Sequence, residues 1–179
     1  MLPGVIELGV RHADAERDAA RCAEIYARYV RDSVASFESV PPDEAEMGRR
    51  IAETSRTHPW LVAERDGDVA GYAYGCPHRA RDAYRWSADV SVYIDERRRG
   101  EGLGRALYGE LLGLLREQGI YTVCAGITLP NEASVALHEG FGFRPIGVYR
   151  AIGFKAGAWR DVCWYQLALR EPAGPPEEP

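Results

Sequence analysis

The chain has 179 residues, of which 46% are apolar and 27% are charged, and its formal net charge is -5. This length suits one domain, and this composition is that of an average globular protein with a buried core. The acidic balance argues against sequence-independent nucleic-acid binding, which needs a basic surface to displace counterions. The chain shows neither a basic segment followed by an apolar run nor a stretch of ~18 apolar residues, so we expect no signal peptide and no membrane span.

The four cysteines, Cys22, Cys76, Cys124 and Cys163, lie far apart, with no C-x-x-C pair and no clustered histidines. A zinc site would need closer ligand spacing. We therefore expect no metal, and we interpret the cysteines as buried free thiols of a cytoplasmic protein.

Hydrophobic periodicity in the first half of the chain predicts both strands and helices. Asp14 and the pair Pro41-Pro42 mark helix starts, and an Asp-Gly turn at residues 66–67 joins two β-type runs into a hairpin. The expected elements are a strand over 5–10, a helix of about four to five turns after Asp14, a helix from Asp43 to about Arg56, and strands over 60–64, 69–74 and 86–94.

The second half of the chain begins with the clearest helix signal, an apolar stripe of leucines that opens at Leu103 and that Gly119 ends. Asn131 caps a shorter helix, which Gly140 ends. The other expected elements are strands over 121–127, 143–152 and 161–169.

This order of elements predicts a mixed α/β (α+β) fold, with a mostly antiparallel sheet of about seven strands flanked by helices. We expect one domain over residues 1–170. Residues 171–179 are rich in proline and glutamate, and we expect them to form a disordered tail.

A glycine-rich turn, Arg99-Gly100-Glu101-Gly102-Leu103-Gly104, joins the strand over 86–94 to the leucine helix. Glycines permit positive φ and a close approach of the backbone to a ligand. The first N–H groups of a helix are unpaired and, together with the helix dipole, bind phosphate groups. Arg97 and Arg98 add positive charge at the same place. The turn is therefore a candidate phosphate or pyrophosphate site.

Three phosphate-binding interpretations of this turn compete with a tight turn that binds nothing. A Walker A loop needs Gly-Lys-Ser/Thr, which Gly104-Arg105-Ala106 does not supply. A dinucleotide-binding fold needs G-x-G-x-x-G early in a βαβ unit, whereas the spacing here is G-x-G-x-G, late in the chain. The third interpretation is the pyrophosphate turn of acyl-CoA enzymes. The arginines and the helix start favour a bound ligand over a bare turn.

The same turn resembles the GNAT superfamily signature, Gln/Arg-x-x-Gly-x-Gly/Ala. Segments along nearly the whole chain sharpen the likeness to the phosphinothricin and methionine sulfoximine acetyltransferase subfamily. These segments include Phe37-Glu38, residues 59–64, 81–86 and 91–94, Leu129-Pro130-Asn131, Leu137-His138-Glu139, Gly153-Phe154-Lys155 and Trp159-Arg160-Asp161-Val162.

The resemblance implies a sheet splayed between its fourth and fifth strands, with acetyl-CoA as the co-substrate in the cleft. It implies that Val92, Tyr93 and Ile94 present backbone groups to the pantetheine arm and the thioester. It also implies a homodimer, with the pocket for a small amine substrate near the interface. The other implied contacts are with the pyrophosphate, from Arg99, Gly100, Glu101, Gly102, Leu103, Gly104 and Arg105, and with the cofactor's arm, from Asn131.

Direct attack of an amine on a thioester needs a neutral amine, a polarised carbonyl and a protonated leaving thiol. Asp89 could relay the amine's proton, or it could be a solvated aspartate or the salt-bridge partner of an arginine. The resemblance favours the base role, although the subfamily carries glutamate at this position. The shorter side chain withdraws the carboxylate by about one C–C bond, on the order of 1.5 Å, which favours a water bridge.

His138 is the second catalytic candidate. An imidazole there can protonate the departing sulfur or take the amine's proton. Alternatively, His138 is an ordinary helix-face histidine bonded to a backbone carbonyl. In either catalytic case, a backbone N–H near Tyr93 or Ile94 would polarise the thioester oxygen.

Arg79, Arg81 and Tyr84 match the subfamily's amino-acid-binding segment, and with Phe37 they are the candidate substrate-binding residues. An arginine fork suits a carboxylate or a phosphinate-like oxyanion, whereas a solvated basic loop and a core aromatic are the alternatives. We expect an N-acetyltransferase acting on a small amino acid or analogue such as phosphinothricin, methionine sulfoximine or methionine sulfone. A protein N-terminus or lysine as the acceptor, and an idle acyl-CoA-binding sensor, stay open.

Overall fold

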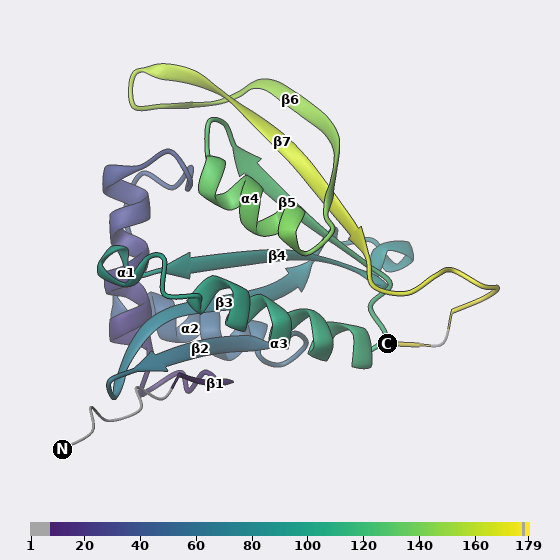
Figure 1. The fold of residues 1–179 in the computed structure, drawn as a ribbon, viewed down its shortest axis with the longest axis horizontal. Helices are drawn as coiled ribbons and strands as arrows, with labels where there is room; N and C mark the ends of the chain where they lie inside the picture. The colour runs from purple at the N-terminus through teal and green to yellow at the C-terminus, as the bar shows by residue number, and fades with distance from the viewer. Residues whose placement is uncertain (1–7, 177) are drawn as a thin grey trace.

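The computed structural model describes residues 8–176 and 178–179, in which seven strands form one sheet with four helices packed around it (Figure 1). The order of strands and helices along the chain is the one that the sequence predicts. None of the helices in these residues has both the length and the apolar character needed to cross a membrane. The strands are β1 (Gly9–His12), β2 (Trp60–Arg65), β3 (Asp68–Pro77), β4 (Ser87–Ile94), β5 (Thr122–Thr128), β6 (Arg144–Lys155) and β7 (Ala158–Ala168), and the helices are α1 (Ala19–Asp32), α2 (Glu44–Thr54), α3 (Leu103–Glu117) and α4 (Glu132–Gly140).

The sheet has the strand order β1-β2-β3-β4-β5-β7-β6, and its neighbouring strands are antiparallel except β4 and β5, which are parallel. The β4–β5 pairing covers only residues 87–89 opposite residues 122–124. Beyond that point the two strands run apart, as Figure 1 shows. This confirms a mostly antiparallel sheet that is splayed between its fourth and fifth strands.

Two apolar clusters hold the helices to opposite faces of the sheet. The leucine stripe of α3 is buried against alternate residues of β4 and β5, including Val90 and Val123. The apolar face of α1, with α2, packs against aromatic residues on the other face, including Trp60 and Tyr72. Because strand side chains alternate between faces, Asp89 and Cys124 lie on the face opposite α3.

The first helix begins later than the sequence predicts. Asp14 accepts hydrogen bonds from the N–H groups of residues 16 and 17 in a separate turn, and α1 begins at Ala19 after Asp18. The buried Asp18 carboxylate accepts bonds of 2.7 and 2.8 Å from Arg11 of β1. This ion pair joins β1 to the residue that precedes α1, and the Asp18 side chain does not cap the helix. The strand expected over 5–10 is found as β1, and its residues 5–7 lie outside the described part of the chain.

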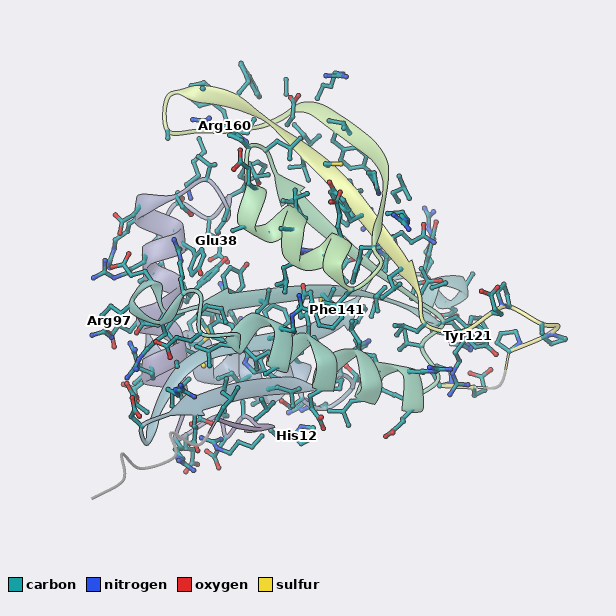
Figure 2. All side chains as sticks on the ribbon, in the orientation of Figure 1. His12, Glu38, Arg97, Tyr121, Phe141 and Arg160 are labelled. Atoms are coloured by element: carbon teal, nitrogen blue, oxygen red, sulfur yellow. The ribbon has the colours of Figure 1, made fainter. Side chains whose placement is uncertain are left out.

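The last hairpin is longer than expected, because β6 and β7 continue to a two-residue turn at Ala156-Gly157. Both turn residues have positive φ, 52° and 72°, as in the primed turns that match strand twist. In the sequence, an alanine does not signal such a turn. Lys155 therefore ends β6 and its Nζ donates to the carbonyls of Ser36 and Glu38, which joins the hairpin tip to the loop after α1. Figure 2 shows Glu38 on that loop and Arg160 near the hairpin tip.

Candidate active site

The divergence of β4 and β5 opens a cleft of about 650 Å³ on the side of α3 and α4. Of the eleven residues that the resemblance assigns to the cofactor, ten line this cleft and Glu101 does not. Its carboxylate instead approaches Arg65 (3.4 Å) and Arg98 (3.7 Å). The residues of that set that line the cleft are Val92, Tyr93, Ile94, Arg99, Gly100, Gly102, Leu103, Gly104, Arg105 and Asn131.

The start of α3 has the features of an anion site. Gly102 precedes the helix at φ +81°, and Gly100 has φ +83°, both in the left-handed region that favours glycine. Among the described residues, no side chain caps the helix start, so the N–H groups of its first turn are free to face a ligand. Arg98, Arg99 and Arg105 line the same end of the cleft. This arrangement matches the chemistry of a phosphate or diphosphate group.

The backbone of β4 presents one edge to the cleft. The N–H of Asp95 bonds to Ala70 of β3 at 2.9 Å, and Ile94 bonds through both its N–H (3.1 Å) and its C=O (2.7 Å) to the Tyr29 hydroxyl. Alternate residues of a strand direct their polar groups to the same edge. The groups of Tyr93 therefore face β3, and those of Val92 face the cleft. Val92 is the β4 residue best placed to offer a backbone N–H to a ligand.

His138 is 3% exposed and lines the cleft from α4. Its Nδ1 lies 2.7 Å from the Ser134 carbonyl, which can only accept, so Nδ1 carries the proton. Its Nε2 then accepts from the Tyr108 hydroxyl at 3.0 Å. Burial lowers the pKa of His138, which keeps the ring neutral. Tyr108 also contacts Phe141, which Figure 2 shows at the end of α4 beside α3.

Asp89 is the last residue of β4 that pairs with β5, and it lies on the sheet face opposite α3. Its Oδ1 is 2.6 Å from Nδ1 of His78, which follows β3. Burial raises the pKa of Asp89, and the hydrogen bond with His78 opposes that rise. The partner of this carboxylate is therefore a histidine rather than the arginine that the sequence suggested as an alternative.

The Cys124 sulfur joins this pair. The His78 nitrogen, the Asp89 oxygen and the Cys124 sulfur all lie within 4.8 Å of one another. Rules on ligand spacing cannot reveal such a group, since its members come from three separate segments. Burial raises the pKa of Cys124 to about 11, so its sulfur stays a neutral thiol. The group is thus a hydrogen-bonded carboxylate–imidazole pair beside a thiol.

A second cavity, of about 340 Å³, adjoins this pair. Of the residues that the sequence predicts to bind the substrate, Arg79 and Tyr84 line this cavity, whereas Arg81 lies outside the lining on the exposed surface. Phe37 also lies outside, because its ring packs on Gly153 of β6, where an added Cβ would come within 2.3 Å of the ring. The sequence interpretation missed several lining residues: His78, Tyr149 and Trp164.

A family model described as an acetyltransferase (GNAT) domain matches residues 12–164. The chain belongs to the GNAT acetyltransferase family. It is therefore an N-acetyltransferase, and the seven-stranded splayed sheet is the family's fold.

Named relatives of this acetyltransferase extend over nearly its whole length. It is 40% identical to a phosphinothricin N-acetyltransferase of Streptomyces viridochromogenes, over 93% of this chain and 90% of the relative. It is 34% identical to an L-methionine sulfoximine/L-methionine sulfone acetyltransferase of Salmonella typhimurium, over 93% of this chain and 97% of the relative. A phosphinothricin acetyltransferase from Sinorhizobium meliloti, solved in complex with acetyl-CoA, superposes with a TM-score of 0.87 at 36% identity. The superposition covers 93% of this chain and 94% of that one.

Proposed function

We propose that this acetyltransferase transfers the acetyl group of acetyl-CoA to the amine of a small amino acid of the phosphinothricin or methionine sulfoximine type. The observation that carries the proposal is the His78–Asp89 pair at the end of the β4–β5 pairing, in which His78 lines the smaller cavity together with Arg79. The names of the relatives agree with this substrate class.

Acetyl-CoA fits the chemistry of the large cleft. The free N–H groups of residues 102–105, with Arg99 and Arg105, would hold its diphosphate. The Asn131 side-chain oxygen caps α4 by accepting from Ser134 N–H at 3.2 Å, which leaves its amide NH₂ for the cofactor's arm. The Val92 N–H would polarise the thioester oxygen as an oxyanion donor.

The reaction needs proton transfer at both the amine and the sulfur. Asp89 serves the amine side, since loss of a proton makes the nitrogen nucleophilic. His138 serves the sulfur side through Tyr108. Rotation about the Cζ–O bond of Tyr108 turns its hydroxyl hydrogen from His138 Nε2 towards the thiolate, which takes the proton, and the second proton that the nitrogen releases as the amide forms restores the Tyr108 hydroxyl. As the nitrogen–carbon bond forms and the carbon–sulfur bond breaks, the sulfur leaves as a thiol.

Arg79 is the group best placed to bind the substrate's acidic end. It lines the smaller cavity, and its guanidinium lies 5.8 Å from the centre of the Trp164 ring. Its planar fork suits a carboxylate or phosphinate. A hydrogen bond to a charged group contributes about 1.5–3 kcal/mol, so Arg79→Ala should raise KM for the amino acid by roughly 10–100-fold. Arg85→Ala, in the same loop but outside the cavity lining, should leave KM unchanged.

The test is free-thiol release from acetyl-CoA with phosphinothricin, methionine sulfoximine and methionine sulfone, run beside peptides with a free N-terminus. Turnover of at least one amino-acid analogue, with the Arg79 effect on its KM, is the expected result. Turnover of the peptides alone would replace this acceptor with a protein N-terminus or lysine. Tight acetyl-CoA binding with no turnover of any amine would identify an acyl-CoA sensor instead.

We also propose a homodimer formed through the β6–β7 hairpin. Apolar side chains stand exposed there, among them Phe154 (63%) and Trp159 (66%), and contiguous exposed apolar surface marks interaction sites. Because Tyr149 of β6 lines the smaller cavity, a second copy on this hairpin would lie near the substrate. Sedimentation equilibrium should give twice the 19.9 kDa of one chain, whereas the mass of a single chain would contradict the proposal.

The cytoplasm is the compartment that we propose for this acetyltransferase. Cys22, Cys124 and Cys163 are buried free thiols, which fits an environment where thiols stay reduced. Cell fractionation should recover the protein with cytoplasmic markers, and recovery in an extracytoplasmic fraction would refute this.

A further inference from the structure

His78 is held in place on several sides. Its Nδ1 lies 2.6 Å from Asp89, and its backbone N–H bonds to the carbonyl of Ser87 at 3.3 Å. Its ring meets Tyr84 and Trp164 edge-on, with ring centres 5.7 and 6.1 Å apart. The imidazole therefore has a defined orientation relative to the carboxylate.

This orientation directs the other ring nitrogen away from Asp89. The ionised carboxylate can only accept a hydrogen bond, so Nδ1 carries the proton and Nε2 keeps a lone pair. His78 is among the residues that line the smaller cavity, whereas Asp89 is not among them. Of the two side chains, the histidine is the one that a substrate in that cavity meets.

We propose that His78 Nε2 is the atom that receives the proton of the attacking amine, and that Asp89 is the positioning residue that fixes the ring's tautomer and stabilises the imidazolium. The inference rests on the function proposed above and changes its proton path. In this path, the His78–Asp89 pair takes the place of the water bridge that the sequence predicts for the short Asp89 side chain.

The proton balance of this path is complete. The substrate ammonium gives one proton to Nε2, and the neutral nitrogen attacks the thioester carbonyl. The nitrogen loses a second proton as the amide forms, and the departing sulfur ends as a thiol. The imidazolium then returns its proton to solvent, which reaches the partly exposed ring. One amide, one thiol and one released proton result.

The groups that face the pair favour a charged carboxylate. Burial raises the pKa values of Cys76 and Cys124 to about 11, so both thiols stay neutral. Arg79 is the nearby cation, and its charge favours the ionised form of Asp89. Tyr84 contributes only a ring edge. Among these described neighbours, Asp89 is thus the anion that can stabilise an imidazolium, an arrangement also used by carboxylate–histidine pairs in other enzymes.

The decisive variant is His78→Asn. An asparagine amide can take the place of Nδ1 and keep the bond to Asp89, but it offers nothing at the position of Nε2. If His78 only positions Asp89, this variant keeps the wild-type kcat. If Nε2 accepts the proton, kcat should fall on the order of 10²–10⁴-fold, with the affinity for acetyl-CoA unchanged. His12→Gln, an exposed histidine of β1, is the matched control and should keep full activity.

A second measurement separates lost chemistry from a damaged fold. Imidazole added to His78→Ala should restore part of the lost activity, and the restored rate should rise with pH because neutral imidazole is the acceptor. Wild-type kcat in His78→Asn, or the absence of imidazole rescue in His78→Ala with unchanged acetyl-CoA affinity, would overturn the inference. If the wild-type protein itself acetylates no amine, the proposed function fails instead, so the two failures are distinguishable.

Discussion

Asp89→Asn is expected to lower kcat on the order of 10²–10⁴-fold while acetyl-CoA affinity stays the same. Asparagine is nearly isosteric, and its carbonyl oxygen can still accept from His78 Nδ1, so the local hydrogen bond survives. What is lost is the negative charge. Without this charge, the imidazolium of His78 is not stabilised, and its Nε2 takes the proton of the amine less efficiently.

The same variant should also change the pH dependence. Burial raises the pKa of Asp89, and the ionised form is the active one, so wild-type kcat/KM should fall as the pH drops through this raised value. The stability of the fold depends on pH in the opposite direction. A carboxyl group whose folded pKa is raised stabilises the fold at low pH and loses that contribution as the pH rises through the folded pKa. At neutral pH, Asp89→Asn should therefore be at least as stable as the wild type.

Three measurements check this: steady-state kinetics across pH, calorimetric titration with acetyl-CoA, and thermal unfolding. Asp89→Glu, which keeps the charge, should retain far more activity than Asp89→Asn. Asp82→Asn, in the exposed segment of the same connection, is the matched control. Wild-type kcat in Asp89→Asn would remove Asp89 from the proposed chemistry.

Gly102→Val should weaken acetyl-CoA binding by roughly 10–100-fold, because a branched residue held in the left-handed region costs about 1–3 kcal/mol. Gly102 has φ +81°. The turn would relax towards an ordinary conformation and carry the N–H groups at the start of α3 away from the diphosphate. The loss should shrink for acetyl-pantetheine, which lacks the diphosphate.

The control for this variant lies in the same helix. Gly109 is exposed, and an added Cβ there would meet no atom within 4 Å. Gly109→Ala should keep the acetyl-CoA affinity and stabilise the fold by about 0.5–1 kcal/mol. Equal acetyl-CoA affinities for wild type and Gly102→Val would show that the diphosphate binds elsewhere.

Local signals predicted most of the fold. The leucine stripe of α3, the Asp66-Gly67 turn and the Asn131 cap each specify a structure through neighbouring residues, and each is found. The start of α1 failed this test. Asp14 and Asp18 are both capping-type residues, and the sequence does not show that Asp14 starts a separate turn while Asp18 forms an ion pair with Arg11 of β1.

The candidate site was predictable where it depends on one segment. The glycine turn is contiguous in sequence, and its residues line the cleft together, except for Glu101, which ion pairs draw aside. The His78–Asp89 pair depends instead on the register of β3 and β4, in which Cys76 lies opposite Asp89. In that register, residues 78 and 89 are diagonal neighbours on one face. The register of the β3–β4 hairpin was the signal that could have identified His78 as the partner of Asp89. Hydrophobic periodicity alone does not determine that register.

The role of Phe37 could not be predicted from the sequence for a different reason. An aromatic residue in a loop can contact a substrate or fill a gap in packing, and its sequence neighbours do not distinguish these roles. Here the absence of a side chain at Gly153, over a hundred residues away, makes room for the Phe37 ring. Arg81 likewise belongs to the loop that contributes Arg79, but the short helical segment Asp82–Tyr84 begins directly after it, and it stays outside the cavity.

A crystal structure with acetyl-CoA and a methionine sulfoximine analogue bound would test the account most directly. It should show the diphosphate on the N–H groups of residues 102–105, the sulfur where β4 and β5 separate, and the substrate nitrogen on the side of His78 Nε2. A diphosphate bound instead in the separate cavity beside Arg21 and Arg28, or a substrate nitrogen remote from both His78 and Asp89, would contradict it.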